Sequence, residues 1–329
     1  MAAVVTPPTP PASAAPAPAA ASNPAPAARI PLDVVEAYNA AIKYNASLSS
    51  PLAAILALGA HIESADIRTT VELIRELDAA SARLKQNFSN IGVACGCNLF
   101  TRFVAQYPQS SKPFKDYTRE LAQAARDYVQ LASKTHRAKI ARLALPFVQD
   151  DFVILCHSYS RVVMEALLLI AQHKRISVLV TDGQPTALGQ RTRSELTAAG
   201  IPCTLILDSA VAYFIDRVDV CMVGSEAVVE SGGLINAVGS YQMALVAKSA
   251  NKPFYALAES YKFHRLFPLS QSDVSASALS ASVNPAREPT HIAPTVDYTK
   301  PELISMVFSD VGVLTPDGVS QYLVSMFSE

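Results

Sequence analysis

The stretch "FVILCHSYSRVVMEALLLIAQHKRISVLVTD", residues 152–182, decides the fold of this chain. It begins with a short run of apolar and β-branched residues, continues with apolar residues at helical spacing, and ends in a second apolar run. Nearly unbroken apolar strands that alternate with helices are typical of a parallel sheet covered by helices on both faces. The stretch therefore predicts the first strand–helix–strand unit of such a sheet.

The same alternation continues along the chain. Further strands are predicted at "CTLILD" (203–208), "VDVCMVG" (218–224) and "PFYALAE" (253–259), with helices between them, and the pair Gly232-Gly233 is expected to stand just before a helix. We predict that residues 146–329 form a doubly wound, Rossmann-like α/β domain.

The residues before this domain have a different pattern. From 32 to 145, Ala, Leu and Ile recur at three- and four-residue spacing, which predicts an all-helical domain broken only at "NIGVACGCNLFTRFV" (90–104). Residues 1–31 are rich in alanine and proline and nearly uncharged, so we expect a disordered arm.

Composition excludes several classes of function. The net charge is −1, so a basic surface for nucleic acid is not expected. No apolar run is long enough for a membrane span, and the first residues resemble neither a signal nor a transit peptide, so we expect a cytosolic protein. The five cysteines are interpreted as reduced thiols, and Cys95-Gly96-Cys97 lacks the second ligand pair that a metal site needs. No glycine-rich nucleotide motif is present, so no cofactor is predicted.

Polar residues stand at the end of every predicted strand. They include Ser158, Asp182, Asp208, Glu226 and Glu259. Because ligands bind at the carboxyl ends of strands in open parallel sheets, these residues predict a pocket along one rim. The alternative for the acids is that they cap the helices that follow.

A resemblance to a known family rests on long stretches of the second domain. "GSEAVVESGGLINAVGSYQMALVAKSANKPFYALAESYKFHRLFPLSQSDV" (224–274), "VDYTKPELISMVFSDVGVLTPDGVSQYLV" (296–324), "ILCHSYSRVV" and "LDSAVAYFIDRVDVCMVGSEAVVESGG" closely resemble the alpha-subunit family of eukaryotic translation initiation factor 2B. The resemblance covers nearly everything after the Ala/Pro arm.

That family is similar in fold to isomerases that act on methylthioribose 1-phosphate and ribose 1,5-bisphosphate. The resemblance places the enzymes' catalytic cysteine at Ser158 and their aspartate at Glu226. A serine hydroxyl is too weak an acid to replace a thiol without a base beside it. Cys156, two residues earlier on the same strand face, is expected to be a core thiol. The resemblance therefore implies a retained pocket without catalysis.

Other positions of the pocket are compared in the same way. Asn236 and Lys262 match residues that hold substrate in the isomerases, and Arg191 matches the Arg of their Gly-x-Arg stretch. Two phosphate-binding arginines of the enzymes fall on Leu48-Ser49-Ser50 and on Val93. The alternatives are a helix cap for Asn236 and solvated charges for Arg191 and Lys262. The predicted site is a vestigial pocket for a phosphate or sugar phosphate, and it consists of Ser158, Arg191, Asp208, Glu226, Asn236 and Lys262.

The resemblance implies a regulatory and architectural subunit. It implies that two copies pair through their α/β domains, bridge the beta, delta, gamma and epsilon subunits of the exchange factor, and help to sense initiation factor 2 phosphorylated on its alpha subunit. Exchange catalysis is then expected in the epsilon subunit. Lys43, Arg68 and Arg75 are candidate contacts for a phosphoserine, with a solvated helix face as the alternative.

Two further alternatives remain open. The chain could be an active sugar-phosphate isomerase that uses Glu226. The apolar segment "LISMVFSDVGVLTPDGVSQYLVSMF" (303–327) is expected either to form a partner surface or to pack on its own sheet.

Overall fold

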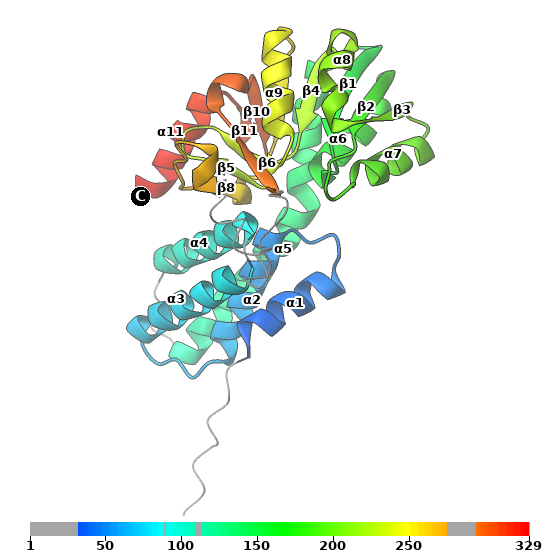
Figure 1. Cartoon of the computed structure of the whole chain (residues 1–329). Helices are drawn as coiled ribbons and strands as arrows, with labels where there is room; N and C mark the ends of the chain where they lie inside the picture. The colour runs from blue at the N-terminus through cyan, green and yellow to red at the C-terminus, as the bar shows by residue number, and fades with distance from the viewer. Residues whose placement is uncertain (1–31, 89, 109–112, 275–293, 329) are drawn as a thin grey trace, which may run out of the picture.

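The computed structural model describes residues 32–88, 90–108, 113–274 and 294–328. The predicted disordered arm, residues 1–31, lies outside the described residues. Figure 1 shows two parts, which we call the helical half (helices α1–α5) and the α/β half (the elements that follow). The predicted fold class, an all-helical region followed by a doubly wound parallel sheet, is confirmed.

The helical half packs around α2. Its helices are α1 (Val34–Tyr44), α2 (Ser50–Ser64), α3 (Thr70–Asn87), α4 (Ile91–Gln106) and α5 (Phe114–Ala144). Helix α2 begins at Ser50 with a proline in its first turn, where the missing N–H costs nothing. It is buried on most of its surface because α1, α3, α4 and α5 all contact it. These contacts form the apolar core of the helical half.

Helix α4 corrects the interpretation of residues 90–104 as a break. Gly92 and Gly96 lower helix propensity there, but the second of them serves packing. A Cβ at Gly96 would lie 2.3 Å from the carbonyl oxygen of Pro51. The glycine therefore allows α4 to approach α2 closely, and the segment is helical despite its composition.

A seven-stranded sheet forms the centre of the α/β half. Its order is β11-β10-β7-β4-β1-β2-β3, and every neighbouring pair is parallel except β10 and β11. The strands are β1 (Phe152–His157), β2 (Ile176–Thr181), β3 (Cys203–Ile206), β4 (Val220–Val223), β7 (Phe254–Leu257), β10 (Met306–Ser309) and β11 (Gly312–Leu314).

Helices cover both faces of this sheet, as the apolar strands require. The carboxyl-terminal part of α5 packs on one face with α6 (Arg161–Ala171) and α7 (Gly189–Ala198). The opposite face is covered by α8 (Val211–Phe214), α9 (Ser240–Ser249) and α11 (Pro316–Ser328). Short 3-10 turns lie at Leu145–Phe147, Asp208–Ala210, Ile215–Arg217, Ser260–Lys262 and Pro301–Leu303.

A second, four-stranded sheet was not expected. It has the order β8-β5-β6-β9, with β5 (Ala227–Val229), β6 (Leu234–Ala237), β8 (Phe263–His264) and β9 (Val296–Thr299). Gly232-Gly233 therefore precedes strand β6, and the prediction of a helix directly after this pair is wrong. The sheet packs its apolar side against α4, so it connects the two halves.

The segment 303–327 packs mainly on its own sheet. Strand β10 pairs with β7, and β11 pairs with β10, so the sheet has two strands that the sequence analysis did not predict. Val307, Phe308, Val319 and Leu323 are buried in the two apolar cores beside the sheet. Of the two alternatives for this segment, the structure favours packing within the chain.

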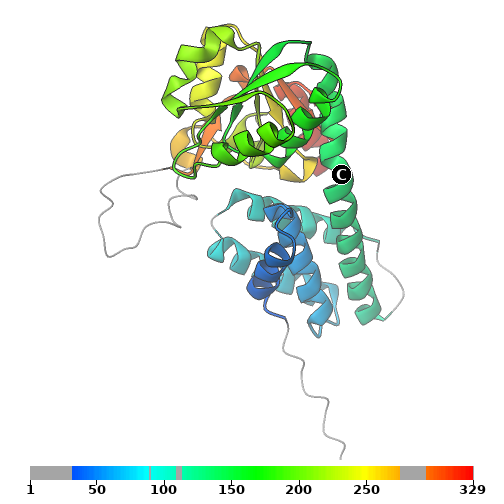
Figure 2. The same cartoon turned by 90° about the vertical axis from the view of Figure 1, so that its right-hand side faces the viewer.

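Helix α5 runs from one half into the other (Figure 2). Its 31 residues are buried at Leu121, Ala125 and Val129 in the helical core, and at Ile140 and Ala144 in the core beside the sheet. The domain boundary predicted at 145 coincides with the end of this helix, but whether the halves are separate domains stays a prediction.

Candidate functional site

A cleft lies where the strand order reverses. From β1 the chain adds β2 and β3 on one side and then returns to place β4 on the other side of β1. The carboxyl ends of β1 and β4 therefore form the topological switch point, at which doubly wound sheets bind ligands. A cleft of about 760 Å³ opens there, between the switch point and the helical half.

The sheet side of the cleft is formed by residues that directly follow strands. Ser160 and Arg161, at the start of α6, follow β1, while Ser225 and Glu226 follow β4. The end of β6 contributes Asn236, whose side-chain amide donates to the Ser240 hydroxyl at 2.9 Å.

The helical half forms the opposite side. The segment before α2 contributes Ser47 and Leu48, and α5 contributes Arg137. The Nη1 of Arg161 donates to the carbonyl oxygens of Ser47 and Leu48 at 2.7 and 2.9 Å. A guanidinium from the α/β half thus holds the loop of the helical half in place.

A buried ion cluster lies at the floor of the cleft. The carboxylate of Glu259, 2% exposed, pairs with Arg137 at 3.1 Å and with Lys262 at 2.9 Å, and it accepts from the Tyr261 hydroxyl at 2.9 Å. Burial alone raises the pKa of Glu259, but Lys262 and Arg137 outweigh burial and hold the pKa at about 2. Lys262 also donates to the Ser225 carbonyl at 2.7 Å. Arg137 and Lys262 are therefore both paired with groups of the chain itself.

Arg191 lies at the rim of the cleft and is also paired within the chain. Its Nε donates to Glu195 at 2.7 Å, and its guanidinium carbon lies 4.0 Å from the ring centroid of Tyr159. More than half of the Arg191 side chain is exposed, so this ion pair contributes little to stability.

The six predicted site residues are therefore divided between two places. Arg191, Glu226, Asn236 and Lys262 line the cleft, whereas Ser158 and Asp208 are not among its lining residues. Asp208 follows β3 at the edge of the sheet, and its carboxylate accepts from the backbone N–H groups of Gly183 and Gln184 at 3.0 and 2.9 Å and lies 3.9 Å from Nδ1 of His157. The ligand-binding role of all six residues stays a prediction.

Ser158 lies beneath the loop that follows β2. The residue is 5% exposed, and a Cβ on Gly183 would lie only 2.4 Å from its hydroxyl oxygen. Its carbonyl accepts from the Thr192 hydroxyl at 2.7 Å. The position at which the resemblance places the isomerases' thiol is thus covered by the chain itself.

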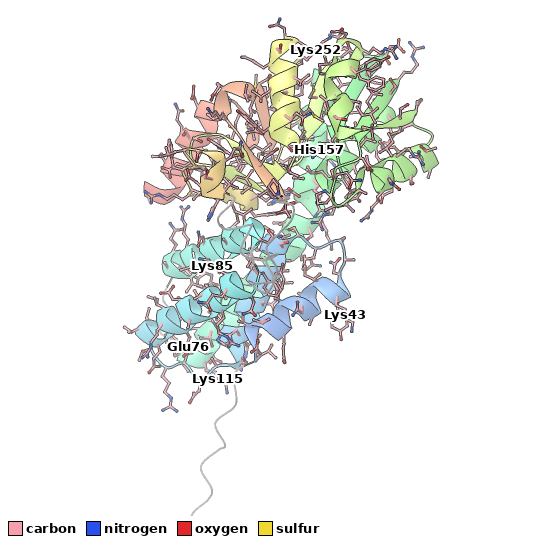
Figure 3. The ribbon with its side chains drawn as sticks, viewed as in Figure 1. Lys43, Glu76, Lys85, Lys115, His157 and Lys252 are labelled. Atoms are coloured by element: carbon pink, nitrogen blue, oxygen red, sulfur yellow. The ribbon has the colours of Figure 1, made fainter. Side chains whose placement is uncertain are left out.

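Neighbouring His157 has a structural role at the end of β1 (Figure 3). Burial lowers the pKa of His157, so the ring is neutral near pH 7. Its Nε2 donates to the Val238 carbonyl at 2.8 Å, and its Nδ1 accepts from the Thr181 hydroxyl at 2.6 Å. The ring therefore joins β1 to β2 and to the segment before α9.

The chemistry that this arrangement offers is recognition of charge. No cysteine lines the cleft, and Cys156 lies in the core, where burial raises the pKa of its thiol well above the usual value. The carboxylate of Glu226 makes no hydrogen bond or ion pair with another described residue. Within the described ranges, no group of His, Cys, Asp and Glu is placed to hold a metal ion. Among the described helices, none combines the length and the hydropathy of a membrane span.

The sequence reasoning did not single out Tyr159, Ser160, Arg161, Ser225 or Arg137 as cleft residues. The signal that could have found most of them is position, because Tyr159, Ser160, Arg161 and Ser225 directly follow the two strands at the switch point. Arg137 had no such signal, since it reaches the cleft from a helix more than a hundred residues before Glu259.

The fold and the cleft define a class of proteins in which a helical region precedes a doubly wound sheet and a polar cleft lies between them. The model of the initiation factor 2 subunit family matches residues 43–316, so the chain belongs to this family. It is 37% identical to translation initiation factor eIF2B subunit alpha of Dictyostelium discoideum, over 89% of this chain and 96% of the relative. It is 33% identical to the protein of the same name from Caenorhabditis elegans, over 89% and 98%.

The relatives also include enzymes. A ribose 1,5-bisphosphate isomerase of Archaeoglobus fulgidus is 29% identical over 65% of this chain and 69% of the enzyme. Among solved structures, a chain of the tetrameric eIF2B-beta2-delta2 complex from C. thermophilum is similar with a TM-score of 0.68. It is 19% identical and covers 89% of this chain and 94% of its own. The eIF-2B of Pyrococcus horikoshii OT3 gives a TM-score of 0.63 at 21% identity, over 87% and 98% of the two chains. At these identities the structures show a shared fold.

Proposed function

We propose that this chain is a regulatory and architectural subunit of the guanine-nucleotide exchange factor for initiation factor 2, in the alpha position, and that it acts in the cytosol. Its similarity to two eIF2B alpha subunits over most of both chains supports this role. Two copies pair through their α/β halves and bridge the beta, delta, gamma and epsilon subunits. The exchange reaction takes place on the epsilon subunit.

The covered position of Ser158 is the observation on which the non-enzymatic role rests. Proton transfer between two sugar carbons needs an acid and a base beside the substrate. The residue at the thiol position is a hydroxyl that does not line the cleft, and Lys262 is engaged by Glu259. The cleft therefore serves as a vestigial pocket that binds a phosphate or sugar phosphate without converting it.

Exposed apolar side chains support the contact with other subunits. Leu207 lies before α8, Tyr213 in α8 and Leu245 in α9, and their side chains are 68%, 78% and 44% exposed. Helices α8 and α9 contact each other. Apolar groups of this size are typical of the centre of a protein interface. The α/β half thus offers a surface on which a second copy or another subunit can pack.

The helical half offers basic side chains for a phosphorylated partner. Lys43 and Arg75 are exposed and form no ion pair with another described residue, and Figure 3 shows Lys43 at the outer end of α1. Arg68 is paired with Asp66 at 2.9 Å. We therefore propose Lys43 and Arg75, rather than Arg68, as contacts for the phosphorylated alpha subunit of initiation factor 2.

Mass-resolved stoichiometry tests the architectural role. The tagged chain is isolated with its partners, and the intact assembly is weighed by native mass spectrometry. We expect two copies of this chain in an assembly of ten subunits. Recovery of the chain alone, or as a dimer without partners under the same conditions, would contradict the proposal.

An active isomerase is the second candidate, and the unpaired carboxylate of Glu226 in the cleft favours it. Purified chain is incubated with ribose 1,5-bisphosphate or methylthioribose 1-phosphate, and the ketose product is measured by a coupled assay. We expect no turnover above background. Turnover that Glu226→Gln abolishes would replace the regulatory proposal with an enzymatic one.

A further inference from the structure

We propose that the first turn of α6, the guanidinium of Arg161 and the hydroxyl of Ser225 together form an oxyanion subsite within the cleft. The subsite would bind the phosphate group of the cleft's ligand. This inference rests on the proposed role of the cleft as a binding pocket, and it assigns residues to that role which the resemblance to isomerases did not provide.

Arg161 is the cleft-lining cation that has no carboxylate partner among the described residues. Arg137 and Lys262 share Glu259, and Arg191 pairs with Glu195. Arg161 instead uses Nη1 to bind two backbone carbonyls, and its Nε and Nη2 groups have no hydrogen-bond acceptor among the described residues. A guanidinium held in place on one side with free donors on the other is suited to bind a phosphate.

The start of α6 adds backbone donors at the same place. Ser160 precedes the helix, but its side chain accepts no N–H group of the first turn. The 11-residue helix thus leaves the N–H groups of its first turn without a capping side chain, at the positive end of its dipole. Ser160, Arg161 and Val162 all line the cleft, so these donors are next to the space that a ligand occupies.

Ser225 provides an independent observation that points to a ligand. The residue is 3% exposed and lines the cleft, yet its hydroxyl has no hydrogen-bond partner among the described residues. It lies beside the start of α6, because a Cβ on the preceding Gly224 would be 2.0 Å from the Ser160 hydroxyl. A buried hydroxyl without a partner is unusual, and a ligand oxygen would satisfy it.

The helical half offers no unpaired cation for this task among the described cleft residues, because its Arg137 is paired with Glu259. Val93 is fully buried, and the segment Leu48-Ser49-Ser50 carries no cation. Arg161 binds the carbonyl oxygen of Leu48 in this segment and that of Ser47 just before it. Among the described cleft residues, the cation without a carboxylate partner therefore lies on α6, and not at the two positions of the helical half that the resemblance compares with the enzymes' arginines.

The unpaired carboxylate of Glu226 sets the orientation of the ligand. It follows Ser225 directly, so a phosphate placed beside it would be repelled. A ligand with one phosphate and several hydroxyls avoids this repulsion when the phosphate faces Arg161 and a hydroxyl faces Glu226.

Calorimetric titration of the full chain tests the subsite, with ribose 5-phosphate, inorganic phosphate and ribose as probes. We expect ribose 5-phosphate to bind the wild type and ribose to show no measurable binding. Ser225→Ala should weaken ribose 5-phosphate binding about 5-fold and Arg161→Gln at least about 10-fold, as expected for hydrogen bonds to a charged group. Arg119→Gln, the matched control at an exposed arginine outside the cleft that pairs with Asp116 at 2.9 Å, should change the dissociation constant by less than about 3-fold.

Thermal unfolding separates binding from folding. Arg161→Gln also loses its bonds to the loop before α2, so its melting temperature can fall; Ser225→Ala removes only an unpartnered hydroxyl and should not lower it. Wild-type affinity in both variants, or in Ser225→Ala if Arg161→Gln does not fold, would overturn the subsite. So would an absence of ribose 5-phosphate binding by the wild type. Turnover of ribose 1,5-bisphosphate would instead overturn the proposed function. The titration would still decide whether the subsite binds phosphate.

Discussion

Residue 158 has a left-handed backbone that few residues other than glycine adopt. Its φ is +55°, and Gly183, which lies against its side chain, has a φ of +74°. Such a conformation costs on the order of 1 kcal/mol or more for a residue with a Cβ, so the surrounding contacts must hold it. The β2–α7 loop thereby covers the hydroxyl and keeps it out of the cleft.

We predict that Gly183→Ala destabilises the chain by about 2–4 kcal/mol, because it combines an unfavourable φ with a clash against Ser158. Gly200→Ala is the matched control: its φ is +79°, but a Cβ there would meet nothing within 4 Å. This change should cost only about 1 kcal/mol. Urea unfolding of both variants measures the difference, and equal losses would show that the contact with Ser158 contributes nothing.

At the same scale, the sequence could place some site residues and not others. Glu226, Asn236 and Lys262 were found because they follow strands or stand in a family motif. Arg161 was not, because its partners are backbone carbonyls more than a hundred residues away, which no local pattern reveals. Asp208 was placed in the pocket because the strand order, which puts β3 at the sheet edge, cannot be read from a list of strands.

Among the elements, length and local pattern decided what could be predicted. The five expected strands of the main sheet are present as β1–β4 and β7, because buried strands in a parallel sheet are continuous apolar runs. The second sheet was missed since its strands have two to four residues and β6 pairs with β9, sixty residues later. Helix α4 was missed because its glycines lower the helix signal in the sequence, although they allow a close contact with α2.

Strand β8 gives a prediction about pH. His264 in β8 is buried against α4, and burial together with the charge of Lys85 lowers its pKa to about 4. The folded chain therefore binds fewer protons than the unfolded chain between about pH 4 and 6.5, so stability should decrease as the pH falls through this range. We expect a loss of about 2–3 kcal/mol between pH 7.5 and 4.5 from this residue.

Chemical denaturation at several pH values tests this contribution. His264→Gln should remove the loss, whereas His173→Gln, a change at an exposed histidine, should leave the pH dependence as in the wild type. Parallel curves for the wild type and His264→Gln would show that the histidine does not titrate as expected.

For the whole molecule, the ion cluster around Glu259 is a buried polar link between the halves. Glu259 belongs to the α/β half and Arg137 to α5, and both side chains are largely buried. Glu259→Gln leaves Arg137 and Lys262 without their counter-charge, so we expect a loss of about 3–5 kcal/mol in the free energy of unfolding. Glu195→Gln, which weakens the exposed pair with Arg191 and a hydrogen bond from the Tyr159 hydroxyl, should cost about 1 kcal/mol or less.

Scanning calorimetry distinguishes two ways in which this loss can occur. A single transition at a lower temperature means that the two halves still unfold together. Two separate transitions in Glu259→Gln mean that the cluster couples them. A melting temperature equal to that of the wild type would contradict the assignment of the cluster as a stabilising contact.

Because α5 is embedded in two cores, it limits both how the protein can move and how it can be divided. At 1.5 Å per residue its 31 residues form a rod about 46 Å long. Closure of the cleft by rotation of one half would have to bend this rod. We therefore expect ligands to bind without a large movement of one half relative to the other. A fragment cut after residue 145 would expose Ile140 and Ala144 to water, and a fragment starting there would lose part of its sheet cover. Neither piece should remain soluble alone, and a truncation that keeps all of α5 with the sheet has the better chance of independent folding.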